Sequence, residues 1–303
     1  MTPPASVAPN TAPGTLPSTP ASLLPIVLAA MQRTPDARLR ALLESLVSHL
    51  HAFVVETRLN EAEFEFALDF INRIGQATHT KNNEAVLVAD LLGVSALVAL
   101  QANADPHGVS DAALLGPFWR DGAPLLSEGR SIAMPGTPGL TLEVRGSVRD
   151  SAGQPLTGVV LDVWQASPKG LYENQDTEQP EMNLRGRFAT DAQGLFFFRS
   201  VRPAGYPVPT GGPGGELLRA QQRHPYRPAH LHFMISKPGF KVLVTQVFPA
   251  DAETLHSDPT FGVTQRLVGD FRSLQRDGQP LVELVHHFTL RPGVMVFPKP
   301  PIG

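Results

Sequence analysis

The chain contains no cysteine among its 303 residues. This absence excludes a disulfide framework and a metal site built on thiolates, because both need the cysteine sulfur. Any metal in this protein must therefore be bound without a cysteine thiolate. With 42% hydrophobic residues the chain is able to bury a core of its own, so neither disulfides nor a metal are required for folding.

Long hydrophobic runs and one-sided charge are missing as well. The longest apolar stretches, such as residues 22–31, are too short to span a bilayer, and the first residues lack the charged start and apolar run of a signal peptide. The net charge of −3 is spread along the chain, without the basic stripe of a nucleic-acid-binding protein. We therefore expect a cytoplasmic protein with no nucleic-acid partner and no membrane insertion.

The first third of the chain has the pattern of helices. Residues 1–21, rich in Pro, Ala, Ser and Thr, are expected to form a flexible tail. Residues 22–115 are expected to form a helical domain, in which Asn60 and Glu63 have the spacing of a capping box and an interrupted helix covers 83–100. Leucines recur three and four apart, as on one helix face, at positions 39, 42, 43, 46 and 50.

Residues 116–303 have a different pattern, in which Gly and Pro become frequent and short runs alternate between apolar and polar residues. Many short strands separated by turns predict an antiparallel β-sandwich, so the fold class is α+β. Two connections, 167–185 and 202–227, are longer than a turn requires, which is typical of functional loops. The runs that predict strands are 140–148, 158–164, 194–201, 230–236, 242–248 and 282–290.

His230 and His232 stand two residues apart at the start of one of these runs. Side chains two apart in a strand point to the same face, so both imidazoles are expected to face one point, at a separation that one metal ion bridges. The alternative interpretation is a pair of histidines on an exposed strand.

The chain has only three tyrosines, and two of them, Tyr172 and Tyr206, lie in the long connections near glycine and proline. A phenolate is a hard, anionic ligand that favours trivalent iron over soft or divalent metals. The alternative for either tyrosine is ordinary packing with its hydroxyl group hydrogen-bonded. Together with the two histidines, these tyrosines indicate a site for ferric iron.

Longer motifs around these residues resemble the intradiol catechol dioxygenase family, in particular its hydroxyquinol 1,2-dioxygenase and chlorocatechol 1,2-dioxygenase branch. The resemblance extends from about residue 38 to residue 271, and only the motifs together make it specific. They are ADLLGVS at 89–95, LGPF at 115–118, LDVWQA at 161–166, GLY at 170–172, LRGR at 184–187, YPVP at 206–209, RHPYRPAHLHF at 223–233 and FGV at 261–263.

The resemblance implies an enzyme with non-haem Fe(III) that cleaves a catechol-type ring with O2. Arg227 matches an arginine beside the bound catecholate, Gln246 matches a glutamine near the same place, and Tyr206 matches a tyrosine that leaves the metal and takes a substrate proton. The helical domain would supply the interface of a homodimer, often with lipid bound along it, and the β-sandwich would be the catalytic domain. The implied iron ligands are Tyr172, Tyr206, His230 and His232.

The pocket implied by the resemblance is mostly apolar, with one carboxylate. Asp90 is suited to accept a hydrogen bond from a third ring hydroxyl, which favours hydroxyquinol (benzene-1,2,4-triol) as the substrate and a hydroxymuconate or maleylacetate as the product. Catechol or chlorocatechol, giving cis,cis-muconates, is the alternative. The implied substrate-binding residues are Leu87, Asp90, Leu115, Gly116, Pro117, Phe118, Val208, Pro209 and Arg227.

Two alternatives from other classes remain at the level of the sequence. One is a non-catalytic β-sandwich binding module with a helical dimerisation domain. The other is a divalent-metal hydrolase or an extradiol oxygenase, for which no acidic residue in the key segments is an evident third ligand.

One stretch departs from the family pattern. Residues 210–215 read TGGPGG, where relatives usually have an Asp-Gly-Pro-Val-Gly run. Glycine in place of both the acid and the valine in the segment Gly211–Gly215 is expected to loosen the loop behind Tyr206.

Overall fold

The structure is a computed structural model that describes residues 16–80, 82–103 and 108–302. The chain divides into two compact units between Asp69 and Phe70. The expected tail lies mostly outside the described residues, and its last two residues belong to the first helix. The division into a tail, a helical domain to residue 115 and a catalytic domain stays a prediction.

Three helices begin the described chain, and side-chain caps explain where they start. Asp36 accepts a hydrogen bond from the backbone of Leu39 at 2.8 Å. Asn60 and Glu63 exchange two hydrogen bonds of 3.0 Å, each side chain accepting from the other residue's backbone N–H. This confirms the predicted capping box. The helices are α1 (Pro20–Met31), α2 (Ala37–Thr57) and α3 (Glu61–Ala77), the last of which crosses the boundary between the units.

The predicted leucine face of α2 is largely exposed. No residue of α1, α2 or α3 whose side chain the structure describes is buried. Leu42 is 50% exposed and Leu46 is 55% exposed. A row of half-exposed leucines of this kind is typical of a surface that a partner covers.

The second unit contributes the interrupted helix predicted over 83–100. Its two parts are α4 (Glu84–Leu91) and α5 (Val94–Asn103), which separate at Gly93, a residue with a φ of +72°. No single described helix is long and apolar enough to cross a membrane, although α4 and α5 together have the length and composition, with a bend of 71° between them. Five residues of α4 are buried.

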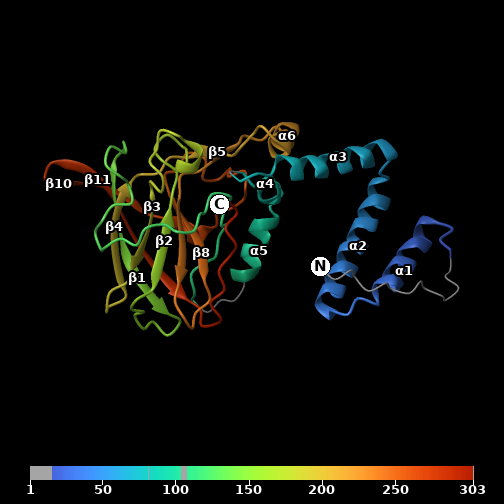
Figure 1. Cartoon of the computed structure of the whole chain (residues 1–303), viewed down its shortest axis with the longest axis horizontal. Coiled ribbons are helices and arrows are strands. Elements are labelled where there is room, and N and C mark those ends of the chain that lie inside the picture. Colours follow the sequence, from blue (N-terminus) through green and yellow to red (C-terminus); the bar gives the residue numbers. More distant parts are fainter. Residues whose placement is uncertain (1–15, 81, 104–107, 303) are drawn as a thin grey trace, which may run out of the picture. The chain divides into compact units, whose positions relative to one another are not determined.

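Two sheets form the β-rich body of the second unit, with α4 and α5 on the side where β8 lies (Figure 1). The first has the order β10-β11-β1-β4 and the second β3-β2-β7-β8-β9. The pairs β1–β11 and β8–β9 run parallel, so the sandwich is mixed rather than purely antiparallel. Parallel neighbours need a long crossover, and residues 151–278 connect β1 to β11.

The strands of the first sheet are β1 (Thr141–Asp150), β4 (Leu195–Val201), β10 (Phe271–Arg276) and β11 (Gln279–Leu290). Those of the second are β2 (Val160–Trp164), β3 (Arg185–Ala189), β7 (Leu231–Ser236), β8 (Leu243–Pro249) and β9 (Val268–Gly269). Short 3-10 turns lie at Glu173–Gln175 and Gln265–Leu267.

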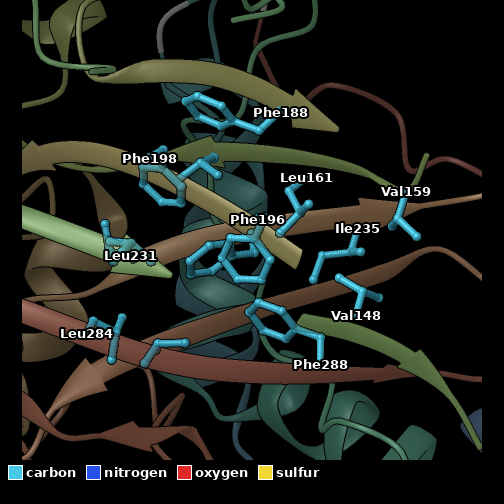
Figure 2. Packing of buried hydrophobic residues seen from close by; sticks show 14 of the residues in the cluster. Val148, Val159, Leu161, Phe188, Phe196, Phe198, Leu231, Ile235, Leu284 and Phe288 are labelled. Atoms are coloured by element: carbon cyan, nitrogen blue, oxygen red, sulfur yellow. The ribbon is translucent and has the colours of Figure 1, made fainter. Parts of the chain in front are cut away.

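The main hydrophobic core takes side chains from both sheets. Figure 2 shows its phenylalanine rings close together among aliphatic side chains. The rings of Phe188 and Phe198 stack at 4.8 Å, and Phe233 lies 5.0 Å from Phe288. Burial of such rings is the main stabilising contribution to the sandwich and gives a rigid frame for the loops at its edge.

The glycine-rich stretch behind Tyr206 is closely packed, which corrects the expectation of a loose loop. It leads into a helix that the sequence did not reveal, α6 (Pro213–Ala220). A Cβ atom on Gly215 would lie 2.0 Å from the carbonyl oxygen of Thr210, and one on Gly212 would lie 2.5 Å from Oε1 of Glu84. The backbone N–H of Gly214 donates to the same Oε1 at 2.8 Å. The glycines therefore allow close approach to a buried carboxylate.

Candidate active site

The two long connections meet beside the start of β7. Strands β5 (Tyr206–Pro207) and β6 (Tyr226–Arg227) form a short antiparallel ladder in which Tyr206 is opposite Arg227. The other connection approaches so closely that a Cβ atom on Gly170 would lie 3.0 Å from the carbonyl oxygen of Gly205 and 3.3 Å from Cβ of Tyr206. This contact brings Tyr172 next to Tyr206.

Four buried side chains converge at this place. The Nε2 atoms of His230 and His232 are 3.0 Å apart, as the spacing of two residues predicts. The ring of Tyr172 lies 5.4 Å from that of Tyr206 and 6.4 Å from that of His232, and the ring of Tyr206 lies 5.6 Å from that of His230. None of the four residues is more than 3% exposed. The structure thus brings together the two tyrosines and two histidines that the sequence indicated.

The imidazole rings are oriented by their other contacts. Nδ1 of His230 lies 2.8 Å from the carbonyl oxygen of Pro228, which is an acceptor only. Nδ1 therefore carries the proton and donates it, and Nε2 keeps a free lone pair that points to the cluster. The ring of His232 stacks on Trp164 at 4.6 Å.

Burial controls the charge state of the cluster. It lowers the pKa of His230 to about 3, with help from the nearby Arg227, and it lowers the pKa of His232 well below the ordinary value. It also raises the pKa of Tyr172 and of Tyr206, although Arg227 partly offsets the effect at Tyr206. The histidines are therefore neutral at physiological pH, the form in which an imidazole can bind a metal, and the phenols need a nearby cation to ionise.

The donor set fits a hard, highly charged metal ion. The hydroxyl oxygen of Tyr172 is buried without a hydrogen-bond partner, as expected of an atom whose partner is an ion. Among the described residues there is no group of three or more His, Cys, Asp or Glu side chains suited to a metal. Two phenol oxygens and two imidazole nitrogens therefore make a site in which phenolate charge offsets the charge of the ion, as trivalent iron requires.

Arg227 is held beside this cluster by three neighbours. Its Nε and Nη2 atoms each donate to one oxygen of Asp258 at 3.1 Å, and Nη2 also donates to Oε1 of Gln246 at 3.1 Å. Nη1 lies 3.4 Å from Nε2 of His230. Asp258 was not identified from the sequence, since nothing local marks a residue 31 positions beyond Arg227 as its partner.

The expected pocket residues fall into two groups. A cleft is lined by Asp90, Leu115 and Gly116, and also by Lys299, Pro300 and Pro301 near the end of the chain. A Cβ atom on Gly116 would lie 3.4 Å from Cε1 of His232, so one of the residues that line this cleft lies against the ring of His232. The sequence analysis did not anticipate that Lys299, Pro300 and Pro301 line this cleft.

The second group does not line that cleft. Phe118 packs 4.7 Å from the ring of Tyr172, and Leu87 and Val208 share a small buried cluster next to α6. Pro117 is buried and Pro209 is half-buried. These residues support the tyrosines and the helix behind them.

Comparison with known proteins identifies the family. Residues 114–292 match the family model described as "Dioxygenase", and residues 36–110 match "Catechol dioxygenase N terminus". Hydroxyquinol 1,2-dioxygenase of Rhizobium sp. is 40% identical over 85% of this chain and 87% of its own. Catechol 1,2-dioxygenase of Candida albicans is 38% identical over 84% of this chain and 85% of its own.

The chain belongs to the intradiol ring-cleavage dioxygenase family. A solved structure of an intradiol dioxygenase, hydroxyquinol 1,2-dioxygenase from Pseudomonas putida DLL-E4, superposes with a TM-score of 0.83 at 36% identity, covering 90% of this chain and 99% of that chain. Both the family and the α+β fold class are therefore confirmed. Intradiol dioxygenases are enzymes, generally Fe(III)-dependent and homodimeric, so the binding-module and extradiol alternatives are set aside.

Proposed function

We propose that this intradiol dioxygenase opens the ring of hydroxyquinol between its two adjacent hydroxylated carbons, with O2 as co-substrate, to give a hydroxymuconate or maleylacetate. The observation that carries the proposal is Asp90, a carboxylate only 4% exposed that lines the same cleft as Leu115 and Gly116. The 40% identity to a hydroxyquinol 1,2-dioxygenase supports it.

The proposed cofactor is a non-haem Fe(III) ion held by Tyr172, Tyr206, His230 and His232. The convergence of these side chains, the neutral histidines and the unpartnered hydroxyl of Tyr172 support this assignment. The chemistry that such an ion supplies when bound is Lewis acidity toward the diol oxygens and an acceptor for electron density from the ring.

The surrounding side chains have roles in proton transfer and charge stabilisation. A catechol that binds as a dianion must lose two protons, of which Tyr206 as a phenolate would accept one and a solvent-derived hydroxide the other. Arg227 is opposite Tyr206 in the β5–β6 ladder and remains charged in this dry site, where it stabilises negative charge on the ring. Gln246 holds one edge of the guanidinium and donates to the carbonyl oxygen of Leu114 at 2.7 Å.

Asp90 provides the selectivity for a third hydroxyl group. Burial raises its pKa to about 6, against the opposing effects of Ser95 and Arg227, so the carboxylate is mostly ionised at neutral pH. A buried carboxylate that loses its hydrogen-bond donor is destabilised, and a substrate without the third hydroxyl binds less well for that reason.

Catechol or chlorocatechol is the second candidate substrate class, with cis,cis-muconates as products. The specific observation in its favour is the 38% identity to a catechol 1,2-dioxygenase over most of both chains.

The deciding experiment is a substrate panel with oxygen uptake and product identification. We expect kcat/KM for benzene-1,2,4-triol to exceed that for catechol and for chlorocatechol. An equal or reversed ratio would overturn the hydroxyquinol assignment and leave the reaction class intact. Cleavage beside the two hydroxylated carbons would overturn the reaction itself.

We also propose a cytoplasmic homodimer that forms through the helical residues and holds lipid along the interface. The half-exposed leucines of α2 support this arrangement, since a second copy would cover them. Light scattering of the purified protein measures the mass, and lipid extraction followed by mass spectrometry identifies any bound chain. A monomer at micromolar concentration would contradict the proposal.

A further inference from the structure

Asp258 lies between β8 and the 3-10 turn at Gln265–Leu267, in a loop that was not expected to contribute to the site. It is 6% exposed, and its two carboxylate oxygens face Nε and Nη2 of Arg227 at 3.1 Å each. This is the side-on bidentate arrangement that fixes the plane of a guanidinium as well as its position.

The loop is built around this carboxylate. The backbone N–H groups of Thr260 and Gly262 donate to it at 3.2 Å and 3.0 Å, and the hydroxyl of Thr260 lies 3.0 Å and 2.9 Å from its two oxygens. Phe261 has a φ of +55°, a conformation that a bulky residue rarely adopts, and its N–H donates to the carbonyl oxygen of Asp258 at 3.0 Å. The backbone therefore adopts an unfavourable local conformation that directs donors to Asp258.

A second arginine anchors the same loop. The guanidinium of Arg223 lies 4.6 Å from the ring centre of Phe261, and it donates to the carbonyl oxygens of Pro259 and of Leu91 at the end of α4. The loop that carries Asp258 is thus fastened to the helix that carries Asp90, and it is not free to follow Arg227 if that side chain moves.

The contacts of Arg227 divide between the two edges of its guanidinium. Asp258 occupies Nε and Nη2, and Gln246 shares Nη2. Nη1 is left to point toward Nε2 of His230, 3.4 Å away. Rotation of the guanidinium about its stem would move Nη1 away from the histidines, and the pair with Asp258 prevents that rotation.

We propose that Asp258 is a positioning residue for the ring-cleavage reaction, which acts by holding Nη1 of Arg227 toward the reacting centre. The inference rests on the proposed function of Arg227 in stabilising charge on the substrate ring. Asp258 itself does not contact the substrate, so its effect reaches the reaction only through Arg227.

The test compares iron-loaded wild-type protein with Asp258→Asn, using benzene-1,2,4-triol and catechol. The asparagine keeps one acceptor but loses the charge and the second acceptor oxygen. We expect kcat to fall about tenfold to a hundredfold, as for a misplaced catalytic group, while KM changes less than about threefold. The iron content per chain of Asp258→Asn should match that of the wild type. The visible absorption band of the iron-loaded variant should match as well.

A double-mutant cycle separates positioning from general damage. Arg227→Met already lacks the guanidinium, so adding Asp258→Asn to it should produce no further loss of kcat. The matched control is Asp251→Asn, which breaks an exposed pair in which Nη2 of Arg202 lies 2.7 Å and 2.8 Å from the carboxylate oxygens. This control should keep the wild-type kcat.

Several outcomes would overturn the proposal. One is a kcat of Asp258→Asn within twofold of the wild-type kcat. Another is a fall in kcat that is fully explained by a lower iron content. The third is a further fall in kcat when Asp258→Asn is added to Arg227→Met. If Asp258→Asn does not fold, Asp258→Glu keeps the charge but moves the carboxylate by one methylene away from its place beside Nε and Nη2 of Arg227, and an unchanged kcat there would overturn it as well. A wild-type enzyme that cleaves none of the diols would instead overturn the proposed function.

Discussion

The imidazole of His232 lies flat against the indole of Trp164, with ring centres 4.6 Å apart and planes inclined by 8°. The two residues are directly opposite each other in the antiparallel ladder of β2 and β7, and Gln246 is opposite His232 on the other side, in β8. Three adjacent strands therefore hold the histidine from both sides. A side chain fixed by the rigid sheet in this way keeps its orientation for metal binding, whereas the tyrosines depend on the packing of the long loops.

Tyr172 is the most direct test of the metal site. Replacement by Phe removes one anionic ligand and leaves the ring packing against Phe118, so iron content and the visible tyrosinate-to-iron band should both fall strongly. Metal analysis and the absorption spectrum measure the two effects. Tyr226→Phe is the matched control because that tyrosine is 53% exposed, and it should keep its iron and colour. Full iron in Tyr172→Phe would contradict the ligand set.

Gly116 lies against the ring of His232, one of the proposed iron ligands. Gly116→Ala would place a Cβ atom 3.4 Å from Cε1 of His232, and it would put alanine at a φ of +72°. Gly122→Ala is the control, since its φ is +90° and nothing lies within 4 Å of the added atom. Both variants should lose about 1 kcal/mol of unfolding free energy from the backbone strain.

Only Gly116→Ala should also change the iron affinity and the visible band, because only there does the new atom contact the imidazole. Urea unfolding and a spectrum of each loaded variant give the comparison. Identical spectra for the two variants would show that Gly116 does not contact the metal site.

Asp90 should control the preference between triol and diol. Asp90→Leu removes the acceptor for the third hydroxyl, so kcat/KM for benzene-1,2,4-triol should fall about tenfold to a hundredfold while that for catechol changes little. Val98→Ala, in the same cleft, leaves the carboxylate and its contacts in place and should keep the preference. A fall of equal size for both substrates would contradict a role in selectivity.

The same preference should depend on pH. The pKa of Asp90 is raised to about 6, so the carboxylate is ionised above that value and increasingly protonated below it. A neutral acid is a weaker acceptor than a carboxylate, and the ratio of kcat/KM for triol over catechol in the wild type should decline as the pH falls below about 6. A ratio that stays constant from pH 8 to pH 5 would contradict this account.

Asp162 gives a prediction about stability. Burial raises its pKa from 3.8 to about 6, although Trp119 donates to it at 3.2 Å. Between these pH values the unfolded chain releases the proton and the folded chain keeps it, so stability falls as the pH rises through this window, by about 3 kcal/mol in total. Asp162→Asn keeps the hydrogen bond from Trp119 and removes the titration.

Urea unfolding of both proteins from pH 3.5 to pH 7.5 measures this difference. The wild type should become less stable relative to Asp162→Asn as the pH rises, with most of the change between pH 4 and pH 6. If the unfolding free energies of the two proteins change with pH in parallel, the pKa of Asp162 is the same in the folded and unfolded states.

Features that depend on neighbouring residues were predictable from the sequence. The capping box of Asn60 and Glu63 and the break at Gly93 follow from backbone geometry within a few residues. The convergence of His230 and His232 follows from the alternation of side chains along a strand.

Contacts between distant segments became visible only in the folded chain. The pair of Arg227 with Asp258, the parallel pairing of β1 with β11 and the close approach of Gly214 to Glu84 join segments whose contact no local pattern encodes. Such contacts depend on how the chain closes its long loops around one core, and many sequences with the same local preferences would close them differently.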